Sequence, residues 1–376
     1  MAKTSLSSIF AYAPDPAATR KRMVAEARTL YEWGLTHERH QPVVQSYAGQ
    51  LRNFYLYPTF DCPLRCPYCY AEGGTRQVAE LDAPAFLRIT QEAIDAGYAR
   101  VVLVGGEPLV YYDFERYLEG LGSLRKGSCA FVLRTSFGFD VSETLLKRLC
   151  GTFDEIVVSI DGDETTHDAV RGLGTWRHAT TNVKRAVDLG ANISINAVMS
   201  KEQSTGNPGE FLKAFCAKLD IPKLTISSPV PMGRAAGTSG PYFEWRSNQR
   251  DDDAVKPLFS CGLGHSLYVQ PDGRAFACYA WCEPHHQLGD LATESLADVL
   301  NRGELLSLMN TGVDSNEKCR TCVVRYLCGG QCKIWVTNKD DVNGGDFDCE
   351  DTKQSLIESL VRRGVISTQE AEAAQS

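Results

Sequence analysis

Three cysteines near the start of the chain, Cys62, Cys66 and Cys69, have a spacing that suits an iron–sulfur cluster. Three residues separate the first two and two residues separate the last two, so the thiols share one short loop. Three thiolates can hold three irons of a [4Fe–4S] cubane and leave the fourth iron open to another ligand. A zinc site would need a fourth protein ligand, and the nearest preceding histidine, His40, is distant in sequence. The trio therefore predicts a cluster with one open iron.

A second set of cysteines lies in the last third of the chain. Its seven members are Cys261, Cys278, Cys319, Cys322, Cys328, Cys332 and Cys349. With 14 cysteines in 376 residues, metal or cluster ligation is expected in a reducing cytoplasm, whereas a disulfide framework is not. Structural zinc would also suit the Cys319–Cys322 pair, but the N-terminal trio favours iron–sulfur clusters here as well. Cys129, Cys150 and Cys216 fit neither pattern and are predicted to be buried as small apolar side chains.

The elements around the trio alternate between strand and helix patterns from residue 51 to about residue 240. Strands are predicted at 51–60, 99–103, 130–134, 155–160, 192–198 and 223–226, with helical segments between them. This order predicts a parallel sheet with outer helices, and six β/α units are too few to close an eight-stranded barrel. We therefore expect an α/β fold, a partial (β/α)6 TIM-like barrel, with functional residues at the carboxyl ends of the strands.

Four segments are expected along the chain. They are an N-terminal helical extension over 1–50, the partial barrel over 51–240, a cysteine-rich domain over 241–352, and a C-terminal helix and tail over 353–376. The extension contains a helix-prone stretch, Pro16–Thr36, whose apolar stripe predicts a surface helix packed on the main domain. The cysteine-rich region has short elements and frequent glycine, so we expect it to need bound metal to hold its shape.

Composition narrows the range of partners. The net charge of −8 and the pI near 5.5 argue against nucleic acid as a main partner. The sequence contains no apolar run long enough to cross a bilayer, so no membrane partner is expected. Its first residues lack the apolar core of a secretory signal, and we expect a cytoplasmic protein.

The loop Cys62-x3-Cys66-x-Tyr68-Cys69 resembles the signature of the radical S-adenosylmethionine (SAM) superfamily. The resemblance covers residues of about 51–240, including the segment Pro231–Ala235, and implies that SAM binds the open iron. In similar proteins, a Gly-Gly-Glu-Pro segment contacts the methionyl amino group, while a serine and an arginine contact the ribose and the carboxylate. By position, the cofactor-binding residues implied here are Tyr68, Gly105, Gly106, Glu107, Pro108, Ser159, Asp161, Arg171 and Asn196.

The C-terminal cysteines resemble the SPASM domain of radical SAM peptide-modifying enzymes, over residues of about 261–349. That resemblance implies two auxiliary [4Fe–4S] clusters. The implied ligands are Cys319, Cys322, Cys328 and Cys349 for one cluster, and Cys261, Cys278 and Cys332 for the other. The second cluster then lacks one ligand. Three interpretations remain open for that position: Cys282, an open iron that binds substrate, or a ligand from elsewhere in the chain.

Together the resemblances imply an enzyme with SAM and three [4Fe–4S] clusters as cofactors, and an external one-electron donor of the flavodoxin or ferredoxin type. Cleavage of SAM would give a 5′-deoxyadenosyl radical that removes hydrogen from the substrate. The first expectation is oxidative modification of a ribosomal peptide, by a thioether or C–C cross-link or by dehydrogenation. The alternative substrate is a small metabolite such as a sugar, aminocyclitol or nucleoside. A third class, a non-catalytic electron carrier, predicts no SAM cleavage.

Overall fold

The computed structural model of the chain describes residues 16–36, 51–124, 127–227, 229–230, 232–236, 262–310, 312–330 and 349–375. Two predicted cluster ligands, Cys261 and Cys332, lie outside these residues, as does Pro231. The chain divides into two compact units. We use the name barrel unit for its described residues 51–236 and 262–310, and the name cysteine unit for 16–36, 312–330 and 349–375.

The barrel unit contains one nine-stranded sheet with the order β6-β5-β4-β3-β2-β1-β7-β8-β9. Strands β1 to β6 are parallel and are neighbours in space in the order of the sequence, as six β/α units require. They are β1 (Asn53–Leu56), β2 (Arg100–Leu103), β3 (Ala130–Thr135), β4 (Glu155–Ser159), β5 (Ile193–Val198) and β6 (Lys223–Ser227). The sheet ends at β6 on one side and at β9 on the other, so the predicted partial barrel is confirmed.

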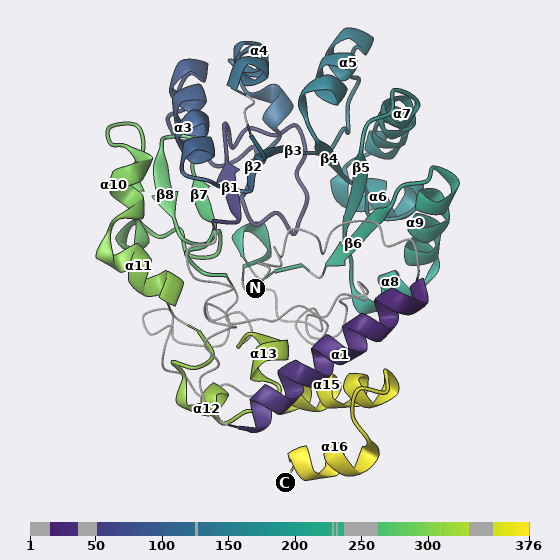
Figure 1. Ribbon diagram of the computed structural model, residues 1–376. Coiled ribbons are helices and arrows are strands. Elements are labelled where there is room, and N and C mark those ends of the chain that lie inside the picture. Colours follow the sequence, from purple (N-terminus) through teal and green to yellow (C-terminus); the bar gives the residue numbers. More distant parts are fainter. Residues whose placement is uncertain are drawn as a thin grey trace. The chain divides into compact units, whose positions relative to one another are not determined.

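Helices cover the outer side of the parallel strands (Figure 1). They are α3 (Ala83–Asp95), α4 (Phe114–Leu124), α5 (Glu143–Thr152), α6 (Glu164–Arg171), α7 (Thr175–Asp188), α8 (Lys201–Thr205) and α9 (Asn207–Lys218). Several begin at a side chain that accepts a hydrogen bond from the first turn, including Asp82, Ser142 and Asp163. Ser200 and Gln203 form a full capping box at α8. These caps set where each helix starts, and so they limit the length of the loop after each strand.

Three short strands extend the same sheet beyond β1. They are β7 (Leu267–Val269), which is parallel to β1, and β8 (Arg274–Phe276) and β9 (Gly289–Asp290), which are antiparallel. Helices α10 (Leu296–Leu300) and α11 (Gly303–Asn310) follow. Residues 262–310, which we predicted to lie in the cysteine-rich domain, therefore share a sheet with the barrel strands.

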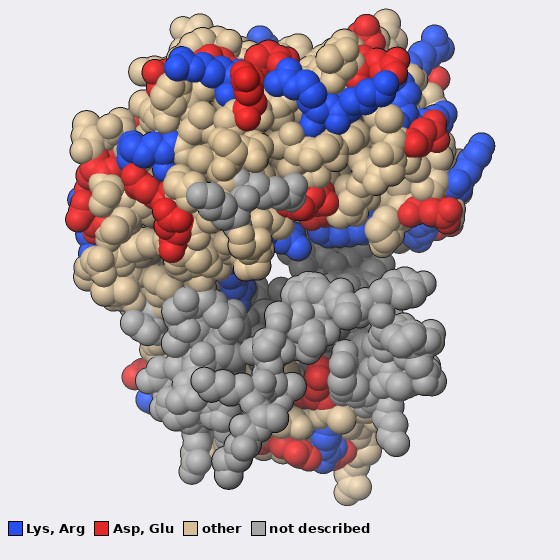
Figure 2. Space-filling model, turned by 45° about the horizontal axis from the view of Figure 1, so that its top comes forward, with Lys and Arg blue, Asp and Glu red and all other residues tan. Residues whose placement is uncertain are grey.

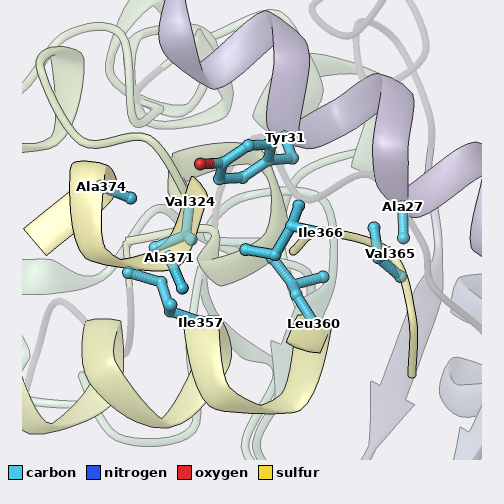
Figure 3. Packing of buried hydrophobic residues seen from close by; sticks show 9 residues of the cluster. All are labelled: Ala27, Tyr31, Val324, Ile357, Leu360, Val365, Ile366, Ala371 and Ala374. Atoms are coloured by element: carbon cyan, nitrogen blue, oxygen red, sulfur yellow. The ribbon is translucent and has the colours of Figure 1, made fainter. Parts of the chain in front are cut away.

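The cysteine unit is helical and has its own apolar core. Its helices are α1 (Pro16–Leu35), α12 (Glu317–Arg320), α13 (Arg325–Cys328), α15 (Glu350–Arg362) and α16 (Thr368–Gln375). Figure 3 shows the core, which contains Ala27, Tyr31, Val324, Ile357, Leu360, Val365, Ile366, Ala371 and Ala374. Full burial of one large aliphatic side chain contributes about 1.5–3 kcal/mol.

Helix α1 contributes directly to this core. Ala27 and Tyr31 on α1 are buried against residues of α13, α15 and α16. The Tyr31 hydroxyl also donates to the main-chain carbonyl of Glu370 at 3.2 Å. Within the cysteine unit, the packing partners of the N-terminal helix are α13 and the C-terminal helices. An amphipathic stripe predicts that one face is buried, but it does not identify the partner.

The visible surface of the barrel unit has mixed charge. Figure 2 shows lysine and arginine side chains interspersed with aspartate and glutamate on the described face. Among the helices of the described ranges, none has both the length and the apolar character that a bilayer crossing requires.

Candidate active site

The cysteine trio lies on the loop after β1, the position expected from the sequence. The Cys69 amide donates to the Cys66 carbonyl at 3.2 Å, which closes a tight turn between the last two thiols. Two sulfurs accept backbone hydrogen bonds at 3.4 Å, Cys62 from Leu64 and Cys69 from Gly73. Hydrogen bonds to ligand sulfurs are one of the means by which proteins tune a cluster, so this loop has the polar groups that a cluster uses.

Burial disfavours the charged form of two thiols of the trio, those of Cys62 and Cys66. It raises the pKa of Cys62 to about 12, and it also raises the pKa of Cys66. The charge of Arg171 opposes this rise at Cys66 but does not outweigh burial, so the loop is poorly suited to a reactive thiolate nucleophile. Bound iron would supply the positive charge that ionises them. In this respect the residues present fit a cluster.

The Gly105-Gly106-Glu107 segment packs directly against the start of the cysteine loop. The Gly106 amide donates to the Thr59 carbonyl at 3.0 Å, and the Glu107 amide donates to the Asp61 carbonyl at 2.8 Å. A Cβ at Gly105 would overlap Thr59, and one at Gly106 would overlap Asp61. Gly105 also has a φ of +146°, which few other residues adopt. Both glycines are therefore needed for the close approach of the two strand-end segments.

The carboxylate of Glu107 lies between the ends of β2 and β3. It is 1% exposed and accepts hydrogen bonds from the Thr135 hydroxyl at 2.7 Å and the Ser136 hydroxyl at 2.6 Å. The main-chain amides of Ser136 and Leu109 donate to it as well, at 2.8 and 3.4 Å. Burial raises the pKa of Glu107 and outweighs these donors. The resemblance implied that Glu107 accepts from the SAM ammonium, and in the structure it accepts from protein donors. The next residue, Pro108, begins the short helix η2 (Pro108–Val110).

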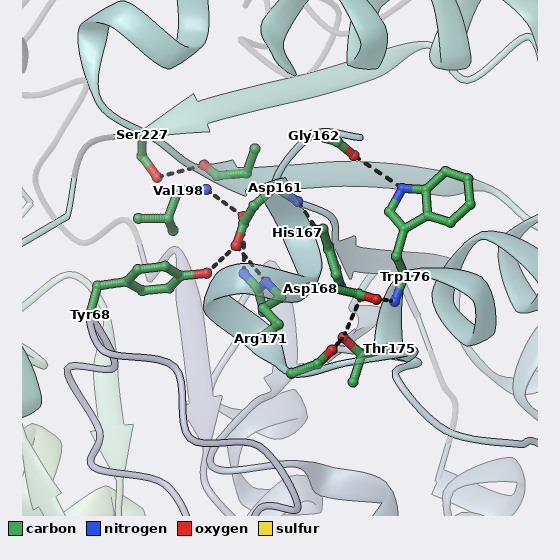
Figure 4. Close-up of polar contacts among 12 residues, drawn as sticks. Tyr68, Asp161, Gly162, His167, Asp168, Arg171, Thr175, Trp176, Val198 and Ser227 are labelled. Carbon is green, nitrogen blue, oxygen red and sulfur yellow. Dashed lines mark hydrogen bonds and ion pairs between the residues drawn. The ribbon is translucent and has the colours of Figure 1, made fainter. Parts of the chain in front are cut away.

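Tyr68 connects the cysteine loop to the end of β4 (Figure 4). Its hydroxyl donates to the Asp161 carboxylate, which also accepts from Arg171 Nε at 2.6 Å and Nη2 at 3.2 Å. The main-chain amide of Val198 donates to the same carboxylate at 2.9 Å. The Arg171 side chain is only 8% exposed, so its charge is compensated inside the protein by Asp161. The resemblance implied that Arg171 contacts the SAM carboxylate, and this contact stays a prediction.

Ser159 and Asn196 lie side by side at the ends of neighbouring strands. They are register partners in the β4–β5 pair, and both are half-buried. Ser159 is two residues before Asp161, so the two polar side chains belong to the same edge of the sheet as the Tyr68 network. The structure thus brings the predicted cofactor-binding residues together at the carboxyl ends of β1, β2, β4 and β5.

The predicted ligand Cys278 lies in the barrel unit, shortly after β8. Its sulfur accepts a hydrogen bond from the Ala280 amide at 3.4 Å, as two sulfurs of the trio do from theirs. The Cys282 thiol donates to the Cys278 carbonyl at 3.2 Å, and burial raises the pKa of Cys282 to about 11. The buried indole N–H of Trp281 has no acceptor among the described residues, and a cluster sulfur would provide one. Cys282 as a ligand stays a prediction.

The other predicted auxiliary ligands, Cys319, Cys322, Cys328 and Cys349, belong to the cysteine unit. The Cys322 amide donates to the Cys319 carbonyl at 2.9 Å. Burial raises the pKa of Cys322, and Cys328 and Cys349 lie near enough to add to that rise. Within the described ranges, no three His, Cys, Asp or Glu side chains converge tightly enough to hold a single metal ion. A cubane does not require such convergence, since each thiolate binds a different iron.

A group of tyrosines between the two cysteine motifs of the barrel unit was not predicted as a unit. The rings of Tyr70 and Tyr279, which directly follow Cys69 and Cys278, meet edge to face with centroids 5.1 Å apart. Tyr268 is within 5.9 Å of Tyr279, and Tyr57 shares a hydrogen bond of 3.0 Å with Tyr70. The sequence signal was an aromatic residue directly after a cysteine ligand, repeated in both motifs.

Comparisons with known proteins agree with this site. The family model of the radical SAM superfamily matches residues 56–214, and that of the SPASM iron–sulfur cluster-binding domain matches residues 261–323. The chain is 26% identical to the PqqA peptide cyclase of Methylorubrum populi over 313 residues, which cover 73% of this chain and 78% of that protein. It is 25% identical to the sporulation killing factor maturation protein SkfB of Bacillus subtilis, over 66% of this chain and 64% of SkfB.

A solved structure shares the fold. SuiB of Streptococcus suis, bound to S-adenosylmethionine, superposes with a TM-score of 0.61 over 76% of this chain and 74% of SuiB, at 18% identity. The two matching family models together span more than half of the chain, and they imply SAM and [4Fe–4S] clusters as cofactors. The chain belongs to the radical SAM superfamily and carries a SPASM domain.

Proposed function

We propose that this chain is a radical SAM maturase that modifies a ribosomally made peptide oxidatively, by a thioether or C–C cross-link or by dehydrogenation of a side chain. The observation that carries the proposal is the likeness to two relatives named for peptide modification, PqqA peptide cyclase and SkfB, over about two thirds of the chain or more. SuiB, which has the same fold, has been solved with its precursor peptide SuiA bound. A peptide is therefore the first substrate class to test.

The cysteines of the chain would hold three [4Fe–4S] clusters. The proposed SAM-binding cluster uses Cys62, Cys66 and Cys69. The proposed auxiliary ligands are Cys319, Cys322, Cys328 and Cys349 for one cluster, and Cys261, Cys278 and Cys332, with Cys282 as the candidate fourth ligand, for the other. When bound, the clusters and SAM supply an electron and a 5′-deoxyadenosyl radical that takes hydrogen from the substrate.

The strand-end residues would position SAM beside the trio. Gly105 and Gly106 bring the backbone close to the cysteine loop, which leaves no side chain in the way of a ligand there. Ser159 and Asn196 offer neighbouring polar groups for the ribose. Arg171 is the proposed contact of the SAM carboxylate. Because its guanidinium already pairs with Asp161, it would donate to both carboxylates.

The chemistry also needs partners outside the chain. An external one-electron donor of the flavodoxin or ferredoxin type would reduce the clusters. A reducing cytoplasm is the proposed location, since free thiols persist there and remain available to iron.

The test is anaerobic reconstitution with iron and sulfide, followed by incubation with SAM, a reductant and candidate precursor peptides from neighbouring genes. We expect 5′-deoxyadenosine, and a peptide product that has lost two hydrogen atoms, detected by mass spectrometry. A variant with Cys62, Cys66 and Cys69 all replaced by Ala is the matched control and should form neither product. Iron-loaded protein that forms no 5′-deoxyadenosine would refute the proposal, and turnover of a sugar, aminocyclitol or nucleoside instead of any peptide would replace the substrate class.

A further inference from the structure

The segment after β6 contacts the cysteine loop from a distant part of the sequence. Arg234 lies in the short helix η3 (Gly233–Ala235), 168 residues after Cys66. Its side chain donates from Nε to the Cys66 carbonyl at 2.8 Å and from Nη1 to the Gly73 carbonyl at 3.0 Å. Its main-chain amide donates to the Cys69 carbonyl at 3.1 Å. One residue therefore binds three carbonyls of the loop that bears the trio.

The residue before it makes this contact possible. Gly233 has a φ of +54°, and a Cβ at this position would overlap the carbonyl oxygen of Cys69 and lie 2.6 Å from that of Tyr70. A larger residue would need both a left-handed backbone and a displaced cysteine loop. Gly233 and Arg234 thus act together, the first by allowing close approach and the second by donating hydrogen bonds.

We propose that Arg234 is the positioning residue of the cysteine loop, which it holds in its ligand-binding shape before any iron is bound. The proposal rests on the proposed cluster-binding role of the loop. A planar guanidinium can donate in two fixed directions at once, which suits two carbonyls separated along a loop. Arg65 covers the remaining cysteine carbonyl, that of Cys62, at 2.6 Å.

The main-chain carbonyls of all three cysteines therefore accept a hydrogen bond from an arginine, either Arg234 or Arg65. A carbonyl bound in this way cannot turn toward the thiolates, where its partial negative charge would repel them. Because η3 lies shortly after β6, the last of the six strands β1 to β6, the shape of a loop after β1 depends on correct placement of the chain after β6. Arg234 therefore couples the segments that follow β1 and β6.

Hydrogen–deuterium exchange of the metal-free full chain tests the proposal without any dependence on turnover. We expect Arg234→Lys, which keeps the charge but loses the planar fork that reaches the two carbonyls from two nitrogens, to speed exchange of the loop amides Cys69 and Gly74 about tenfold. Gly233→Ala should have the same effect by a different route. Exchange in β3, Ala130–Thr135, should stay unchanged and would show that the sheet remains folded.

The matched control is Arg177→Lys, at a side chain on α7 that is 75% exposed and paired with Glu164. It should leave loop exchange at the wild-type rate. In the reconstituted protein, the SAM concentration that gives half of the spectral change of the reduced cluster should rise about tenfold in Arg234→Lys and not in Arg177→Lys. The variant with Cys62, Cys66 and Cys69 replaced by Ala gives the spectrum of the auxiliary clusters alone, which is subtracted from the spectrum of each protein.

Loop exchange at the wild-type rate in both Arg234→Lys and Gly233→Ala would overturn the proposal. A second outcome separates the two proposals. If loop exchange is faster in the variants but the spectrum of reconstituted wild-type protein does not respond to SAM, the proposed function is refuted and the positioning role stands.

Discussion

Two described cysteine loops, the loop of Cys62, Cys66 and Cys69 and the loop of Cys319, Cys322 and Cys328, each accept hydrogen bonds from an arginine, although their surroundings differ. In the barrel unit, Arg234 donates to the main-chain carbonyls of Cys66 and Gly73. In the cysteine unit, Arg325 donates to the carbonyl of Cys322 at 3.4 Å. A guanidinium suits both loops because it offers several donors in one plane. The comparison suggests a shared solution for loops that have cysteine ligands but little regular structure.

The two loops also share a close approach by a glycine. A Cβ at Gly233 would overlap the Cys69 carbonyl, and one at Gly34, near the end of α1, would overlap the Val323 carbonyl. What differs is the support behind each loop. The trio follows a strand of a nine-stranded sheet, whereas the other loop is supported by a few helices, one of them from the N-terminal end of the chain.

The difference in support places different demands on the two arginines. Arg325 is fully buried and forms an ion pair with Asp314 at 3.3 Å, and it donates to the carbonyls of Trp33 and Gly34 at the end of α1. Arg234 is half-buried, and its side chain donates to carbonyls of the loop. The cysteine unit should therefore depend on a single buried cation for stability, while the barrel unit depends on its sheet.

The largest expected effect is that of Arg325→Met. Removing one partner of a buried pair leaves the Asp314 carboxylate uncompensated, and we expect a loss of about 3–5 kcal/mol in the stability of the cysteine unit. Exchange of the α1 and α15 amides in the metal-free protein measures it. The double variant Arg325→Met, Asp314→Leu should recover part of the loss. Equal stability of wild type and Arg325→Met would show that the two loops do not differ in this way.

The next effect concerns the glycine of α1. Gly34→Ala places a methyl group on the Val323 backbone, and we expect a loss of about 3 kcal/mol in the stability of the cysteine unit. The matched control is Gly122→Ala on α4, where a Cβ would meet no atom within 4 Å. There the better helix propensity of alanine should stabilise by up to about 1 kcal/mol. If both substitutions changed the free energy of unfolding in urea by the same amount, the close approach of Gly34 to Val323 would not contribute to stability.

The smallest effect is a pH dependence confined to the barrel unit. Burial, with a smaller contribution from the charge of Arg171, lowers the pKa of His167 to about 4, although Asp161 and Asp168 act in the opposite direction. An unfolded histidine has a pKa of about 6.5, so below that pH the unfolded chain binds a proton that the folded chain rejects. Stability contributed by neutral His167 is complete above about pH 6.5 and is lost as the pH falls toward 4.

Between pH 7 and pH 5, the titration of His167 should lower the free energy of unfolding of the barrel unit by about 2 kcal/mol. Unfolding of wild type and His167→Asn, compared at the two pH values, measures it, because the variant retains an acceptor for the Asp161 amide but has no titrating ring. The same pH slope in both proteins would assign the dependence to other groups.

The parallel part of the fold could be predicted because its strands are short apolar runs of β-branched residues. The EIVVS and ISINAV segments, for example, became β4 and β5 within one residue of their predicted bounds. The extension of the sheet by β7 to β9 could not, since strands of two or three residues carry almost no periodicity.

The residues predicted to bind SAM share one edge of the sheet, because strand ends collect there in any parallel fold. What the sequence did not predict is how these residues pair with one another. The Asp161–Arg171 pair and the contacts of Arg234 join segments that are neighbours only after folding. Spacing identifies residues that can ligate iron, but it does not identify the distant donors that hold them.

The most direct measurement is iron analysis with spectroscopy of the reduced, anaerobically reconstituted protein, with and without SAM. About twelve iron atoms per chain are expected for three cubanes, and about eight in the variant with Cys62, Cys66 and Cys69 replaced by Ala. The wild-type spectrum should change on addition of SAM, and the spectrum of the variant should not. Equal iron content in the two proteins, or zinc in place of iron at that loop, would contradict the account.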